Sequence, residues 1–147
     1  MNNNFLSSRI LIPYTLIENS RQLEACYEQL KDADWITFDT EFVGEKRFTT
    51  LICLIQLSSE EANFLIDPIR VEDLRPFFDL IEDPHILKIT HAGENDYRLL
   101  YQQFNVLPKN VFDTQLAAGL LGYRYPSGLG KLVSAELNVQ LKKGFAV

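Results

Sequence analysis

The chain has 147 residues, of which 46% are hydrophobic and 12% aromatic, and its formal net charge is −6. A chain of this length can bury a substantial core, so we expect one compact domain. The negative charge excludes a protein that holds nucleic acid on a broad basic surface, because neutralising phosphates requires clustered lysine and arginine.

Residues 1–34 are expected to form an N-terminal arm, a strand and a helix of the same domain as residues 35–147. Apolar residues recur at helical spacing over residues 19–33, where Asn19 and Ser20 are candidate N-caps. The chain shows no internal repeat, low-complexity tract or interdomain linker. The sequence therefore gives no reason to divide the chain into more than one domain.

Three strand-like runs follow, at residues 35–43, 51–58 and 63–67, and their short connections favour an antiparallel meander. Beyond them, strands and helices alternate. We expect helices at residues 71–81, 94–104, 114–121 and 129–137, with strands at 86–90 and 111–113. This order predicts an α/β fold: a mixed sheet of three antiparallel strands followed by β–α units, with helices on both faces.

Cys26 and Cys53 lie far apart among apolar residues, outside any CxxC pair or His/Cys cluster. We interpret both as core thiols in a reducing compartment, and we expect a cytoplasmic protein. The N-terminus lacks the basic and apolar regions of a signal peptide. No apolar segment reaches membrane-spanning length, so we expect no membrane partner.

Two acidic residues, Asp39 and Glu41, interrupt the apolar run at residues 35–43. They point the same way because strand side chains alternate between faces. Neighbouring carboxylates in a buried strand repel each other and lose hydration, which a divalent cation would offset. The alternative is a pair at an exposed strand end, or one neutralised by lysine or arginine. Lys46 and Arg47 follow the pair and either contact phosphates or form a solvated charged hairpin.

A third carboxylate, Asp96, falls in the first turns of the helix expected at residues 94–104. It precedes Leu99 and Leu100 by three and four residues, which places it on the core-facing side. Capping of its own helix is the alternative explanation. The combination with Asp39 and Glu41 favours a shared cation site, which would make an acidic protein compatible with a polyanionic substrate.

Several short motifs occur in a fixed order over residues 35–147. Phe38-Asp39-Thr40-Glu41-Phe42 and the segment from His91-Ala92 to Asp96 contain the three acids. The others are Cys53-Leu54-Ile55-Gln56-Leu57, Ile66-Asp67-Pro68, Phe112-Asp113-Thr114-Gln115-Leu116-Ala117-Ala118 and Leu120-Leu121-Gly122-Tyr123. Together they resemble the ribonuclease D branch of the DEDD exonuclease superfamily, whose first and second motifs match the two acidic segments.

This resemblance implies a ribonuclease H-like fold and hydrolysis of phosphodiester bonds from a 3′ end, with Mg²⁺ or Mn²⁺ as cofactor. It assigns the catalytic and metal-ligand roles to Asp39, Glu41 and Asp96. In such a site, two ions activate a water and stabilise the leaving oxygen. The implied partner is the 3′ end of a single-stranded nucleic acid, with RNA favoured over DNA.

The third motif of this branch, a tyrosine followed four residues later by an acidic ligand, has no match. No tyrosine follows Tyr125, and no aspartate follows Asp113. We therefore expect residues 35–147 to be an exonuclease core truncated before that motif, with weak or no activity alone. Asp113 is expected to cap the helix that begins near Thr114 rather than to be the fourth ligand.

Two other functions stay open: a catalytically incomplete module that binds nucleic acid or protein, and a generic mixed-sheet domain whose acids are incidental. Candidate substrate-binding residues are Thr40, Phe42, His91 and Tyr97. Phe42 and Tyr97 flank the carboxylates and could stack on a terminal base, although core packing is the default for Phe42. His91 could act as a general base, but a role in ordering the backbone is favoured.

Overall fold

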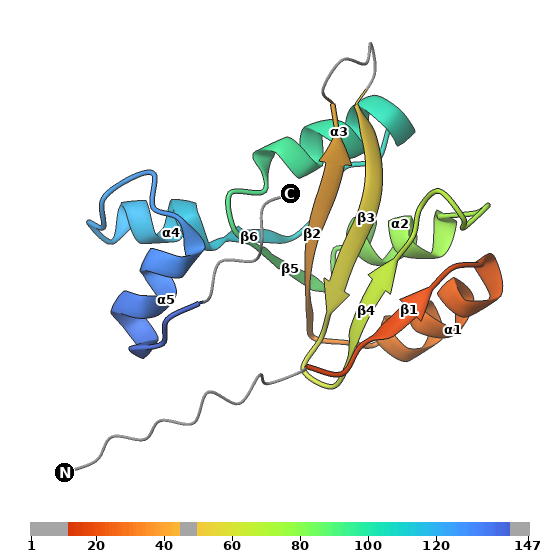
Figure 1. The fold of residues 1–147 in the computed structure, drawn as a ribbon, viewed down its shortest axis with the longest axis horizontal. Helices are drawn as coiled ribbons and strands as arrows, with labels where there is room; N and C mark the ends of the chain where they lie inside the picture. The colour runs from red at the N-terminus through yellow and green to blue at the C-terminus, as the bar shows by residue number, and fades with distance from the viewer. Residues whose placement is uncertain (1–11, 45–49, 142–147) are drawn as a thin grey trace.

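The computed structural model describes residues 12–44 and 50–141 and shows a mixed sheet flanked by helices (Figure 1). The strands are β1 (Thr15–Ile17), β2 (Trp35–Val43), β3 (Leu51–Ser58), β4 (Asn63–Ile66), β5 (Leu87–Thr90) and β6 (Val111–Asp113). The helices are α1 (Ser20–Leu30), α2 (Arg75–Glu82), α3 (Glu94–Phe104), α4 (Thr114–Leu120) and α5 (Leu129–Leu137). The expected α/β fold is therefore confirmed.

The sheet has the strand order β1-β4-β3-β2-β5-β6. Strands β2, β3 and β4 form the expected antiparallel meander. The other pairings, β1 with β4, β2 with β5 and β5 with β6, are parallel. This topology places β2 in the interior of the sheet, where it joins the meander to the β–α units.

Local sequence explains most element boundaries. Asn19 caps α1, because its side-chain oxygen accepts the Gln22 N–H at 3.0 Å. Helix α3 ends where Asn105 adopts the left-handed conformation, a common way to terminate a helix. Helix α2 begins at Arg75 rather than residue 71, because Pro76 lacks an N–H and tolerates only the first helical turn.

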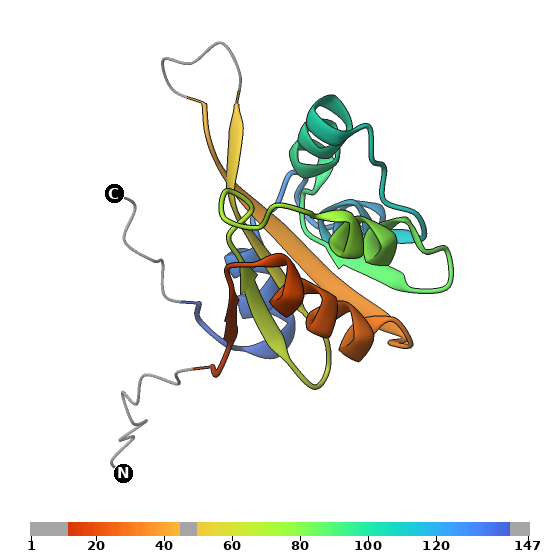
Figure 2. The same cartoon turned by 90° about the vertical axis from the view of Figure 1, so that its right-hand side faces the viewer.

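The hydrophobic core lies between the sheet and helices α1, α2 and α3 (Figure 2). Leu23 from α1, Phe77 from α2 and Leu100 from α3 are all fully buried there. The Phe38 ring of β2 packs edge-on against Phe77, with ring centroids 6.1 Å apart, and at the same distance from Tyr97. Apolar packing thus fixes β2 against α2 and α3.

Helices α4 and α5 follow β6 and extend away from α1 (Figure 1). Only Ala118 is buried in α4, and no residue of α5 is buried. Of the two cysteines, Cys26 is a core thiol, and burial raises its pKa to about 12. Cys53 is only half-buried, so its assignment to the core was wrong. Within the described residues, no helix combines the length and apolar character needed to cross a membrane.

Candidate active site

The acidic residues meet at an open edge of β2. This strand pairs with β3 from Thr37 to Val43, but its pairing with β5 ends at Thr37. Beyond that point Asp96 of α3 replaces the neighbouring strand: its Oδ1 accepts the Thr40 N–H at 3.1 Å and also the Thr40 hydroxyl. The contact brings a carboxylate 56 residues away in sequence to the residue between Asp39 and Glu41.

Asp96 is buried, with 7% of its surface exposed, and lies in the first turn of α3. Two donors from Thr40, its N–H and its hydroxyl, hold the carboxylate there. The N-cap of α3 is Gly93. Asp96 therefore does not cap its own helix, and this alternative to a shared site was wrong.

Asp39 and Glu41 lie on the same, exposed face of β2, while Phe38 and Thr40 face the core. The expectation of two acids within a buried strand was therefore wrong, and the alternative of a pair at an exposed strand end fits their exposure. The pKa of Asp39 is raised by partial burial, by the negative charge of Asp96 and by that of Glu41. No lysine or arginine of the described residues forms an ion pair with either acid.

A groove of about 520 Å³ opens beside Asp39 on the face of the sheet opposite the core. Its lining residues come from β2, β3, β5, the turn after β5 and the starts of α4 and α5: Thr37, Phe38, Asp39, Gln56, Ser58, Ile89, Thr90, His91, Thr114 and Leu129. Gln56 pairs with Asp39 across β2 and β3, so their side chains are neighbours on this face. Gln56 and Ser58 were not predicted as site residues, although their polar side chains in an apolar run were a usable signal.

His91 lies on the wall of this groove with both ring nitrogens engaged. Its Nδ1 is 2.9 Å from the Thr114 hydroxyl, and its Nε2 is 3.0 Å from the carbonyl oxygen of Ser127. A carbonyl oxygen only accepts, so Nε2 carries a proton and donates it. This geometry favours the role of ordering the backbone over that of a general base.

The other candidate substrate residues differ in accessibility. Thr40 is buried and its polar groups serve Asp96, so it positions a carboxylate instead of presenting a side chain to a ligand. Phe42 is 45% exposed, and the default of core packing was wrong for it. The half-buried Tyr97 packs on Phe38, and its hydroxyl bonds to that of Thr90.

The close approach of Tyr97 to the turn before α3 depends on Gly93. A Cβ at this position would lie 2.5 Å from the Tyr97 hydroxyl oxygen and 2.9 Å from Thr90 Oγ1. Any larger residue would push these side chains apart. Gly93 is thus a further residue on which the site depends, and its place directly before the expected helix was the only sequence signal.

The donor set fits a divalent cation in its chemistry. Carboxylate oxygens are the ligands that Mg²⁺ and Mn²⁺ prefer, and the mutual repulsion at Asp39 is what a cation would relieve. Across residues 12–44 and 50–141, however, no three acidic, His or Cys side chains are arranged as a ready-made metal site. Lys46 and Arg47, the candidate phosphate contacts, lie outside the described residues.

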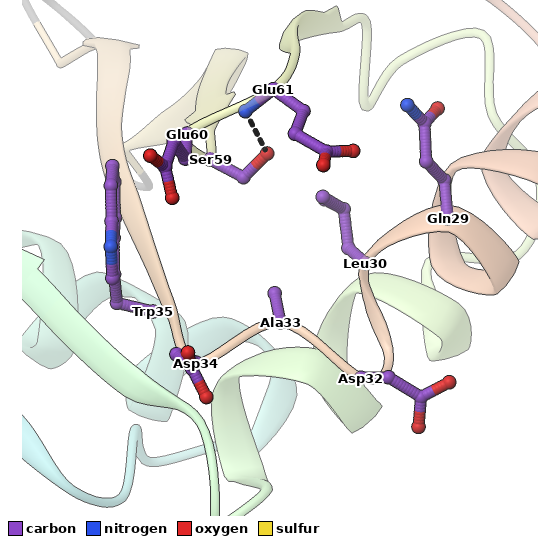
Figure 3. A pocket seen from close by; sticks show the side chains of 9 residues that line it. All are labelled: Gln29, Leu30, Asp32, Ala33, Asp34, Trp35, Ser59, Glu60 and Glu61. Carbon is purple, nitrogen blue, oxygen red and sulfur yellow. Dashed lines mark hydrogen bonds between the residues drawn. The ribbon is translucent and has the colours of Figure 1, made fainter.

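A second hollow, of about 250 Å³, lies at the opposite end of β2 from Glu41 (Figure 3). It is lined by the end of α1, the start of β2 and the β3–β4 turn: Gln29, Leu30, Asp32, Ala33, Asp34, Trp35, Ser59, Glu60 and Glu61. Its four acids are exposed, and the hydrogen bond drawn in it joins the Glu61 N–H to Ser59 Oγ at 3.2 Å. These acids belong to the solvated surface and do not contribute to the site at Asp39.

Known proteins share both the sequence and the fold. The family model described as 3′-5′ exonuclease matches residues 14–146. Ribonuclease D of Bartonella henselae is 38% identical over 129 residues, which are 87% of this chain and 32% of that protein. The crystal structure of Escherichia coli RNase D superposes with a TM-score of 0.85 and 31% identity, covering 89% of this chain and 35% of that one.

A Trypanosoma brucei RNase D in complex with RNA U12 has a TM-score of 0.80 at 21% identity, covering 89% of this chain and 49% of that one. This likeness bears on the fold alone. The chain spans about a third of the length of the curated relatives it matches. The family match, the similar sequences and the shared fold agree, and the chain belongs to the ribonuclease D-like 3′-5′ exonuclease domain family.

Proposed function

We propose that this chain carries the acidic core of a metal-dependent 3′-5′ exonuclease that hydrolyses RNA from its 3′ end. The contact of Asp96 with Thr40 carries the proposal, because it joins a distant carboxylate to the Asp39–Glu41 pair at the mouth of a groove. The E. coli relative is described as an exoribonuclease involved in structured RNA processing, which supports RNA as the substrate class. The cytoplasmic location expected from the cysteines stays a prediction.

In this proposal Asp39, Glu41 and Asp96 hold two Mg²⁺ or Mn²⁺ ions. Such ions supply an activated water and charge stabilisation for the leaving oxygen. Asp96 is held in place by Thr40, while Asp39 and Glu41 stay exposed to the incoming strand. The cations would also offset the repulsion between an acidic protein and phosphates, for which the chain carries no surplus of positive charge.

The groove is the proposed binding place of the 3′-terminal nucleotide. Gln56 and Ser58 offer hydrogen-bonding groups beside Asp39, and Ile89 and Leu129 offer apolar contact. Phe42 is accessible for stacking on a base. A single-stranded end suits this shape because its bases are free to leave the stack.

The fourth acidic ligand expected from the family's third motif has no counterpart in these 147 residues, so we expect weak activity from them alone. The test is degradation of a 3′-labelled single-stranded RNA with Mg²⁺ or Mn²⁺. We would compare this chain with a fusion in which the part of B. henselae ribonuclease D that follows the matched segment is attached after Val147. Variants of the fusion would carry Asp39→Ala or, as the control, Asp34→Ala in the remote acidic hollow.

The expected result is stepwise shortening by the fusion that Asp39→Ala abolishes and Asp34→Ala leaves unchanged. A deoxyribonucleotide of the same sequence would report the preference for RNA. If no folded, metal-binding version shortens the RNA, the chain is instead a binding module that keeps the fold without the reaction.

A further inference from the structure

The Asp113 carboxylate joins two parts of the chain that the helix-capping role alone would not connect. Its Oδ1 accepts the N–H groups of Gln115 at 2.8 Å and Leu116 at 3.3 Å, which cap α4 as expected. The same Oδ1 accepts the Ala92 N–H at 3.1 Å, and Oδ2 accepts the Gly93 N–H at 2.9 Å. One side chain thus satisfies donors of the turn before α3 and of the first turn of α4.

The turn that Asp113 holds needs an external partner. Ala92 has a φ of 57°, a left-handed conformation that costs energy for any residue with a Cβ. Gly93 follows as the N-cap of α3 and has no side chain with which to satisfy the helix N-terminus. Two N–H groups directed at one carboxylate stabilise both features.

The position of this turn determines where Asp96 lies. Asp96 is three residues after Gly93, in the first turn of α3, and its Oδ1 is bonded to the N–H and hydroxyl of Thr40. Movement of the helix start by a fraction of a hydrogen-bond length would weaken those contacts. The effect would reach the acidic cluster without Asp113 touching a metal ion or substrate.

We propose that Asp113 is a positioning residue, which ties the start of α4 to the turn before α3 and thereby holds Asp96 against β2 beside Asp39 and Glu41. The metal-binding consequence of this inference rests on the proposed function. Burial alone would raise the pKa of Asp113, but its four N–H donors outweigh burial and lower the pKa, so the carboxylate stays ionised as an acceptor.

Two substitutions separate this role from capping of α4. In Asp113→Asn, the amide oxygen can keep the three contacts of Oδ1, while the NH₂ group faces the Gly93 N–H and breaks that bond. In Asp113→Ser, the hydroxyl still caps α4 but does not span both segments. The matched control is Asn19→Ala, which removes the N-cap of α1 at a distance from the site.

The first measurement is amide hydrogen exchange and the chemical shift of the Thr40 N–H, which reports the bond to Asp96 and needs no metal. We expect roughly tenfold faster exchange of this amide and a changed shift in both Asp113 variants, because the acceptor is less well placed. The second is calorimetric titration with Mn²⁺, for which we expect an affinity about tenfold weaker than wild type. Asn19→Ala should lower only the unfolding midpoint.

An unchanged Thr40 amide in the folded Asp113 variants would overturn the inference, as would the same change in Asn19→Ala, since the effect would then be global loss of stability. An altered amide with unchanged Mn²⁺ affinity would also overturn the claim that Asp113 serves the cluster. If wild type itself binds no Mn²⁺, the proposed metal site fails, and the Thr40 amide alone decides whether Asp113 positions Asp96.

Discussion

The two faces of the sheet are built in different ways, and β2 belongs to both. Towards helices α1–α3, Ile36, Phe38 and Thr40 are buried, and the surrounding residues form one apolar cluster. Towards the groove, Asp39 and Glu41 are exposed, and α5 contributes no buried residue. Residues adjacent in sequence therefore serve stability and function separately, because a strand turns alternate side chains to opposite faces.

The difference teaches how an acidic site can exist in the middle of a sheet. The covered face supplies the free energy of folding through apolar burial, while the groove face holds charges that repel one another. Asp96 connects the two faces, since it is buried on the helix side yet adds its charge to the exposed pair. Substitutions on the covered face should change stability more than those on the groove face.

The largest effect is expected from Phe77→Ala on the covered face. The Phe77 side chain is fully buried between Phe38 and Phe78, so its removal leaves a cavity and should lower the free energy of unfolding by about 3–5 kcal/mol. Denaturant unfolding measures this. The matched truncation Leu120→Ala, at a side chain 89% exposed in α4, should change it by less than about 0.5 kcal/mol. If both variants lost the same free energy of unfolding, the covered face would not be the main source of stability.

The next effect concerns Lys88, on the covered face. Among the residues that the structure describes, it is the only lysine or arginine with no exposed surface. Its Nζ donates to the carbonyl oxygens of Asp83 and, at 2.6 Å, Ile86, beside the end of α2. Burial lowers the pKa of Lys88 to about 8, with Asp83 opposing and Lys109 adding to the shift. Between about pH 8 and the ordinary lysine value of 10.5, the unfolded chain binds a proton that the folded protein does not.

The Lys88 contribution to stability should therefore rise with pH across that window, by at most about 3 kcal/mol, and less where the two carbonyls favour the ammonium. The measurement is the free energy of unfolding of wild type minus that of Lys88→Met from pH 7 to 10.5, since other groups titrate in both. A flat difference would show that Lys88 is solvated in the folded protein.

A third effect compares neighbouring threonines on the two faces of β2. Thr40→Val removes the hydroxyl that donates to buried Asp96 and should lower the free energy of unfolding by about 2 kcal/mol, because the carboxylate keeps only the Thr40 N–H of its two donors. Thr37→Val makes the same change on the groove face, where no hydrogen bond of the Thr37 side chain joins it to another described residue. Its unfolding free energy should stay near that of wild type. A larger loss in Thr37→Val would reverse the assignment of faces.

The smallest effect is a gain in stability from Asp39→Asn. Since burial, Asp96 and Glu41 raise the pKa of Asp39, the folded protein favours its protonated form, and stability falls as the pH rises through that raised pKa. Without metal at neutral pH, the variant should be more stable than wild type by less than about 1 kcal/mol, because an exposed charge is screened. In Mn²⁺ the order of the melting temperatures should invert. If Asp39→Asn is less stable than wild type without metal, the carboxylates do not repel Asp39 in the folded protein.

Local pattern predicted the elements well. The helix at residues 94–104 and the strand at 111–113 have the expected bounds, and Asp113 caps α4 as expected. Hydrophobic spacing and capping depend on residues that are close in the sequence, so the sequence alone could predict these boundaries. The start of α2 was placed four residues early, because apolar spacing continued through a segment that Pro76 keeps out of the helix.

By itself, the sequence determined the α/β class and the order of elements, and it supplied the three acids of the proposed site. The tertiary structure alone decided that Asp39 faces a groove, that Asp96 bonds Thr40, and that Lys88 is buried. These facts depend on the order of strands in the sheet, on the end of the β2–β5 pairing at Thr37, and on which face of the sheet the helices cover. Such long-range pairings are set by the burial of the whole core, and no local window of residues contains them.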